Sequence, residues 1–81
     1  MDLDWHKLVL TTEWLERIDR LALRRFGQPG LAEEAAAYVL DGLADGDWAV
    51  CRHYSGRSRP EHYLLTVINN LFEEFSRIYD L

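Results

Sequence analysis

The residues best suited to chemistry lie in a short cationic and aromatic stretch in the second half of the chain. Positions 52–63 hold three Arg against one Glu, a net charge of +2, together with two His. Single-stranded nucleic acid is bound by cations along its backbone and by aromatic faces on which its bases stack. The side chains that could do this are Arg52, Tyr54, Arg57, Arg59, His62 and Tyr63. The pattern leaves a simpler alternative open, a solvated loop whose aromatic residues anchor it to the core.

Other chemistry is poorly supported by the residue types present. Cys51, His53 and His62 could supply three metal ligands, but zinc sites usually combine closely spaced paired ligands, and the chain has a single cysteine. We therefore expect Cys51 to be a small buried residue, with no metal and no cofactor. Glu73 and Glu74 are expected on a solvated helix surface. No nucleophile elbow or phosphate-binding glycine loop occurs, so no catalytic residue is predicted and an enzyme is not expected.

Composition limits the class of protein further. The 81 residues predict one domain, 1–81, with a modest core, and a hydrophobic fraction of 48% is too high for a disordered chain. The net charge of −5 argues against bulk electrostatic binding to duplex nucleic acid. The residues before position 6 do not resemble a signal peptide, and no apolar stretch approaches the ~20 residues of a membrane span. We expect a cytoplasmic protein with no membrane partner.

Hydrophobic periodicity predicts an all-α fold, a compact bundle of three main helices plus one or two short ones. The main helices are expected over 12–26, 31–44 and 60–79, and a short one over 47–54 with Asp47 as its N-cap. Thr12 is the expected N-cap of the first helix, and residues 1–10 form either a leading helix or a packed arm. The expected inward residues are Leu15, Ile18, Ala22, Phe26, Leu31, Ala35, Tyr38, Val39, Leu43, Leu64, Val67, Ile68, Leu71, Phe72, Phe75, Ile78 and Tyr79.

The run from Tyr54 to Leu71 resembles a signature of the bacterial sigma-70 family, especially its extracytoplasmic-function members. These often read aromatic-x-Gly-x-Ser-x-Pro/Phe-x-x-aromatic-Leu, followed by an apolar helix that contains Asn-Leu. The matching residues are Gly56, Ser58, Pro60, Tyr63, Leu64, Asn70 and Leu71. Upstream, 30–34 and 39–40 look like the start of the preceding family helix, so the resemblance spans about residues 13–78. It implies the all-helical region-two domain, which melts promoters and binds polymerase.

The resemblance also implies partners and a role in transcription initiation. The second main helix of that family docks on the coiled coil of the largest subunit of core RNA polymerase. By resemblance, that surface would be Glu33, Glu34, Tyr38 and Asp41. The family's loop and third helix capture the melted, single-stranded promoter DNA, which would place the six residues of the cationic and aromatic stretch near DNA. An anti-sigma factor is a further partner that the resemblance suggests.

The alternative is a sigma-like interaction or regulatory module that has lost DNA binding, with a homodimer as one form. Ala37-Tyr38 stand where the family commonly has Gln-Glu, and Asn69 stands where it commonly has Arg. Exposed tryptophans at positions 5, 14 or 48, or a large exposed apolar patch, would favour this alternative because aromatic residues supply most interface hot spots.

Overall fold

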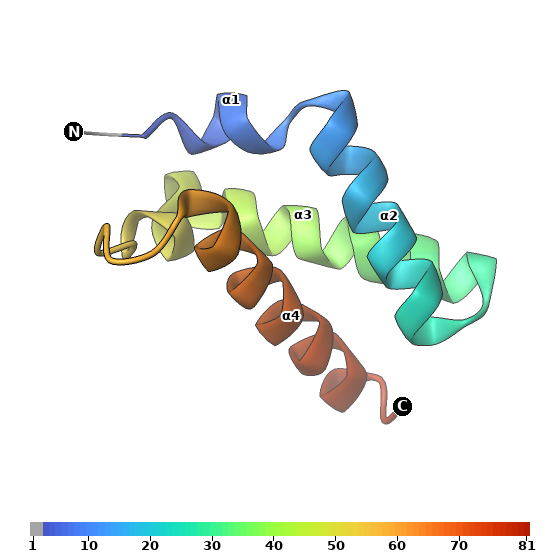
Figure 1. Cartoon of the computed structure of the whole chain (residues 1–81). Helices are drawn as coiled ribbons and strands as arrows, with labels where there is room; N and C mark the ends of the chain where they lie inside the picture. Colours follow the sequence, from blue (N-terminus) through green and yellow to red (C-terminus); the bar gives the residue numbers. More distant parts are fainter. Residues whose placement is uncertain (1–2) are drawn as a thin grey trace.

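All regular structure in residues 3–81, the part of the chain that this computed structural model describes, is helical (Figure 1). The elements are α1 (Trp5–Val9), α2 (Thr12–Phe26), α3 (Pro29–Arg52) and α4 (Pro60–Ile78). The predicted all-α bundle with three main helices is confirmed, and the segment before α2 contains a short leading helix. The helices expected over 31–44 and 47–54 correspond to the two parts of α3, which non-helical backbone at positions 45–48 separates, and the second part ends at Arg52, two residues earlier than predicted.

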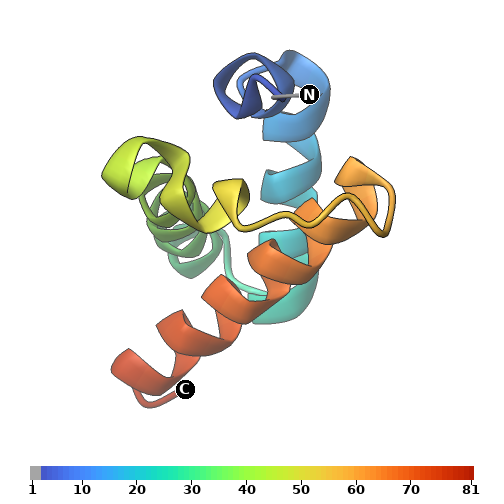
Figure 2. The same cartoon turned by 90° about the vertical axis from the view of Figure 1, so that its left-hand side faces the viewer.

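The central helix of the bundle is α3, which packs against α1, α2 and α4. In Figure 1, α2 crosses one end of α3, and α1 lies over its other end. The loop 53–59 leaves that same end and leads into α4, so α1 and the loop lie close together (Figures 1 and 2). The Cα radius of gyration is 12.5 Å, close to the ~12 Å expected for a compact domain of this length.

Local capping interactions set the bounds of α2. The Thr11 hydroxyl accepts a hydrogen bond from the backbone N–H of Trp14 at 3.2 Å, so the N-cap is one residue earlier than the predicted Thr12. At the other end Gly27 takes a left-handed conformation, with φ of 72°, and its N–H donates to the Leu23 carbonyl at 2.8 Å. A residue without Cβ adopts this conformation without steric cost.

A left-handed turn interrupts α3 near its C-terminal end. Asp45 is extended, and the φ angles of Gly46, Asp47 and Trp48 are 62°, 58° and 63°. Asp47 is therefore not the predicted N-cap, because an N-cap residue has extended backbone and right-handed residues follow it. A bulky residue such as Trp48 rarely adopts positive φ, which strains the backbone. The buried Trp48 ring, edge-on to His6 at 6.0 Å between ring centroids, helps to hold the turn.

The core draws side chains from all four helices. The buried residues are Trp5, Val9, Trp14, Ile18, Ala22, Ala32, Ala35, Ala36, Val39, Leu43, Trp48, Cys51, Leu64, Val67, Ile68, Phe72 and Phe75. Two predicted inward residues are instead exposed, Ile78 at 60% and Tyr79 at 55%. The apolar stripe continues to these positions, but the end of α4 projects away from α3, so no helix covers them (Figure 1).

Within residues 3–81, no helix is both long enough and apolar enough to cross a membrane.

Candidate nucleic-acid interface

The predicted strand-binding residues gather at one end of the molecule, around the loop that joins α3 to α4. Arg52 ends α3, Arg57 and Arg59 lie in or beside the loop, and His62 lies in the first turn of α4. All four side chains are exposed. A phosphate backbone crossing this end could therefore meet several cationic groups without any rearrangement of the core.

The two tyrosines of the predicted site form a pair that also anchors the loop. Tyr54 and Tyr63 are half-buried, with ring centroids 5.1 Å apart and a 49° angle between the rings. The Tyr54 hydroxyl donates to the carbonyl oxygen of Ser58, and the Tyr63 hydroxyl donates to that of Val50 at 3.0 Å. Burial raises the pKa of Tyr63 above its ordinary value. The tyrosines thus have the anchoring role of the simpler alternative, while Arg57, Arg59 and His62 around them are exposed to solvent.

Trp5 of α1 joins this pair, which sequence reasoning did not foresee. Its ring lies edge-on to Tyr54, with centroids 5.7 Å apart at 85°, and is tilted against Tyr63 at 6.2 Å. The Trp5 side chain is buried. We call Trp5, Tyr54 and Tyr63 the aromatic cluster. Nothing in the spacing of residues so far apart in sequence could have indicated their contact.

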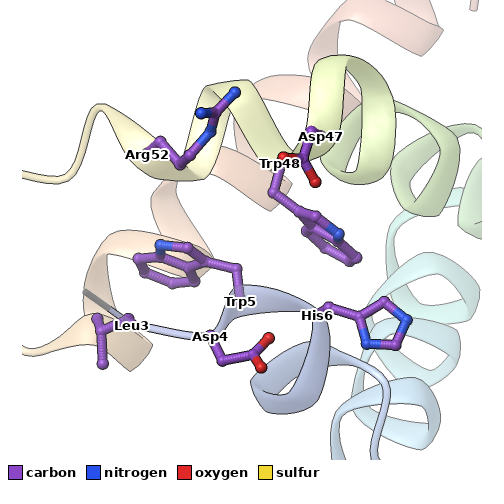
Figure 3. A pocket seen from close by; sticks show the side chains of 7 residues that line it. All are labelled: Leu3, Asp4, Trp5, His6, Asp47, Trp48 and Arg52. Atoms are coloured by element: carbon purple, nitrogen blue, oxygen red, sulfur yellow. The ribbon is translucent and has the colours of Figure 1, made fainter.

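A shallow pocket of about 330 Å³ lies beside the aromatic cluster, between α1 and the end of α3 (Figure 3). The Arg52 guanidinium at its edge donates from Nη2 to the Gly46 carbonyl oxygen at 2.9 Å, which braces the left-handed turn. Asp4 caps α1, because its Oδ1 accepts from the backbone N–H of Lys7 at 3.1 Å. Of the predicted strand-binding residues, only Arg52 lines this pocket. The lining residues are Leu3, Asp4, Trp5, His6, Asp47, Trp48 and Arg52.

Cys51 lies in the core, as expected for a small apolar residue. Its side chain is fully buried, and burial raises the pKa of the thiol to about 11. A neutral thiol is a poor nucleophile and a poor metal ligand. In the described residues 3–81, no group of three or more His, Cys, Asp or Glu side chains is placed to bind a metal ion.

The residues expected to face polymerase divide into two groups. Glu33, Glu34 and Asp41 are exposed along one side of α3 with Ala37 between them, and we call these four residues the acidic face. Tyr38 is instead half-buried in the contact between α3 and α4. Its hydroxyl donates to the carboxylate of Glu74, and its ring lies 5.6 Å from that of Phe75. The hydrogen bond to Glu74 is the main cause of a raised pKa for Tyr38.

The surface offers little of the aromatic exposure that a hot-spot interface would need. Trp5, Trp14 and Trp48 are 5%, 6% and 8% exposed, so none of the three is available as an anchor for a partner. The exposed large hydrophobic side chains in the described range are Leu3, Leu10, Leu23, Ile78, Tyr79 and Leu81. The last three of these lie at or just after the end of α4.

Comparisons of the chain with protein-family models, with curated proteins and with solved structures find no match.

Proposed function

We propose that this chain is a sigma-factor-like transcription initiation domain that binds core RNA polymerase and the melted promoter strand. The observation that carries the proposal is the separation of charge over two surfaces. Four exposed cationic or titratable side chains surround the tyrosine pair at one end of the bundle, and the acidic face lies along α3. A domain with this distribution can bind a strand and a protein at the same time.

The loop end has the groups that single-strand binding requires. Arg57 and Arg59 are exposed on either side of Ser58, and the loop turns at Gly56, whose φ is 84°. Each phosphate neutralised by an arginine releases condensed counterions, which gives affinity without sequence preference. Bases that leave the helical stack could then lie against the nearby aromatic rings.

The acidic face has the charge and shape for a basic protein partner. Glu33, Glu34 and Asp41 present three carboxylates, while Ala37 leaves room for a partner backbone to approach. Complementary charge raises the rate of encounter and selects the partner. On the resemblance of the sequence to the sigma-70 family, we assign this face to the coiled coil of the largest polymerase subunit. Tyr38 supports the acidic face indirectly, because the hydrogen bond from its hydroxyl to Glu74 fixes α3 against α4.

Binding to that isolated coiled coil, measured by titration calorimetry, is the first test. We expect saturable one-to-one binding that Glu34→Lys weakens at least about tenfold, since it reverses one of three charges on the acidic face. Glu16→Lys makes the same charge change on the exposed surface of α2 and should leave the affinity within about twofold. Absence of binding at about 100 μM, or equal loss in both variants, would rule out the acidic face as the polymerase site.

Strand binding is tested by replacing the two loop arginines together. Arg57→Ala combined with Arg59→Ala should lower affinity for an unpaired promoter strand and reduce the slope of log K against log salt by about 1.4. Arg20→Ala combined with Arg24→Ala removes the same charge from exposed positions of α2 and is the matched control. If the loop variant keeps the affinity and slope of the unchanged protein, the loop is not the strand site.

A sigma-like interaction module without DNA binding is the second candidate. It is favoured by the exposure of Ile78, Tyr79 and Leu81 and by the use of both site tyrosines as loop anchors. This candidate predicts protein binding without measurable strand binding, and self-association in sedimentation velocity if the partner is a second copy. Strand binding that depends on the loop arginines would exclude it.

A further inference from the structure

In the aromatic cluster, Trp5 contacts the two tyrosine rings that the proposed strand site would use. Tyr54 lies in the loop 53–59 that also carries Arg57 and Arg59, and Tyr63 lies in the first turn of α4 directly after it, so these are the rings on which a base would stack. Trp5 packs on both of them, with centroid distances of 5.7 and 6.2 Å. An indole and a nucleobase are both flat and aromatic, so they would compete for the same tyrosine surface.

The tyrosine pair is held in place by contacts that do not involve Trp5. The Tyr63 hydroxyl is bonded to the Val50 carbonyl, and the Tyr54 hydroxyl to that of Ser58. The two rings also contact each other. The pair is therefore expected to keep its position if α1 moves away, which would leave an aromatic surface beside the loop cations.

Helix α1 is attached to the core mainly through three side chains, the buried Trp5 and Val9 and the partly buried Leu8. It is five residues long, and only Trp5 and Val9 in it are buried. A helix of this length does not form by itself in water, so α1 exists only while it stays docked. Just Leu10 and Thr11 separate it from α2, and they can act as a hinge. His6 rests on Trp48, so undocking would also free the strained turn in α3 to relax.

We propose that α1 is a removable cover that regulates strand binding, with Trp5 occupying the tyrosine surface on which an unpaired base stacks. The inference rests on the proposed strand-binding function and adds its regulation. Only molecules with α1 undocked bind the base. The apparent affinity is therefore the intrinsic affinity multiplied by the fraction of molecules in which α1 is undocked. A bound strand in turn favours the undocked state.

The test compares two tryptophan substitutions that remove buried rings of equal size. Trp5→Ala exposes the tyrosine pair, and we expect it to bind a fluorescein-labelled single strand of about 12 nucleotides at least about fivefold more tightly, the gain of one stacked base. Trp14→Ala is the control, because Trp14 is equally buried but lies on α2 with the Arg17 guanidinium 4.9 Å from its ring centroid. It should not raise the affinity. Circular dichroism confirms that each variant is helical.

Hydrogen exchange on the unchanged protein gives a readout that does not depend on any variant folding. The cover predicts that saturating strand speeds exchange of the α1 amides and slows exchange in the loop. Slower or unaltered exchange in α1 at saturation would overturn the inference, as would tighter binding by Trp14→Ala equal to that of Trp5→Ala.

The same binding measurements distinguish an error in the proposed α1 cover from an error in the proposed strand-binding function. If the unchanged protein binds strand through Arg57 and Arg59 but Trp5→Ala binds no tighter, the strand site stands and the cover is wrong. If neither the unchanged protein nor Trp5→Ala binds strand, the proposed function fails and the cover fails with it. Binding by Trp5→Ala alone would be the strongest support for the cover.

Discussion

Tyr63 connects three parts of the molecule through one side chain. Its hydroxyl donates to the Val50 carbonyl on α3, and its ring contacts Tyr54 in the loop and Trp5 on α1. A buried hydroxyl without a partner is costly, so the bond to Val50 allows this polar group to lie close to the core. Tyr63 therefore serves both the fold and the candidate site, and its substitution would not separate the two roles.

Cys51 offers a prediction that concerns the core alone. Its thiol pKa is raised by burial to about 11 in the folded chain, from an ordinary value of 9.0. The folded state thus holds this proton more tightly than the unfolded state. The stability that this difference contributes is complete below pH 9.0 and is lost as the pH rises toward about 11.

Urea unfolding at several pH values measures this loss. Between about pH 9 and pH 11, the free energy of unfolding should fall by roughly 1–2 kcal/mol more in the unchanged protein than in Cys51→Ala. Burial and the neighbouring Cys51 raise the pKa of Tyr63, so the part of this shift that comes from Cys51 is included in the measured difference between the two proteins. Parallel pH profiles would mean that the thiol is not shielded from water as the structure indicates.

At the scale of elements, the geometry of the candidate site depends on how closely α3 and α4 pack. A methyl group built on Gly42 would lie 2.9 Å from Cδ2 of Leu71, which is too close without movement of the leucine. The absence of a side chain at Gly42 thus lets the two helices approach. Their crossing sets where the loop 53–59 begins and ends, and so where its arginines lie.

Two glycine substitutions in the same helix test this close approach. Gly30→Ala meets open space in the first turn of α3 and should raise the free energy of unfolding by about 0.5 kcal/mol, because alanine favours helix. Gly42→Ala should lower it by about 0.5–1 kcal/mol, because Leu71 must shift. In a Leu71→Ala background the same change should become stabilising. If thermal unfolding shows equal increases in stability for both substitutions, a methyl group fits at position 42 without displacing Leu71.

Charge governs the behaviour of the whole molecule. The net charge of −5 repels nucleic acid over most of the surface, and three arginines oppose this at the loop end. A duplex presents dense charge and no free base faces, whereas a single strand has lower charge density and bases able to stack. Under the proposed function, this charge distribution favours an opened strand over a closed duplex.

This balance predicts a preference that fluorescence anisotropy can measure at one fixed salt concentration. An unpaired strand should bind at least about tenfold more tightly than a duplex of the same sequence, since base stacking is worth ~1–3 kcal/mol per base. Equal affinity for both forms would point to purely electrostatic contact and would argue against stacking at the tyrosine pair.

The sequence by itself determined the helices and most of the core. Periodic apolar residues predicted α2 and α4 closely, and Gly27 with Pro29 marked the end of α2, because these signals act within a few residues. The exposure of the cationic loop was also predictable, since charged side chains of this kind are seldom buried without partners.

Only the tertiary structure decided the contacts between residues far apart in the chain. The docking of Trp5 on Tyr54 and Tyr63 and the bond from Tyr38 to Glu74 depend on how the helices cross. The same holds for Ile78, where a continuous apolar pattern meets no neighbouring helix. The left-handed turn at Trp48 also lies beyond local rules, because burial of its ring against His6 favours a backbone conformation that local sterics disfavour.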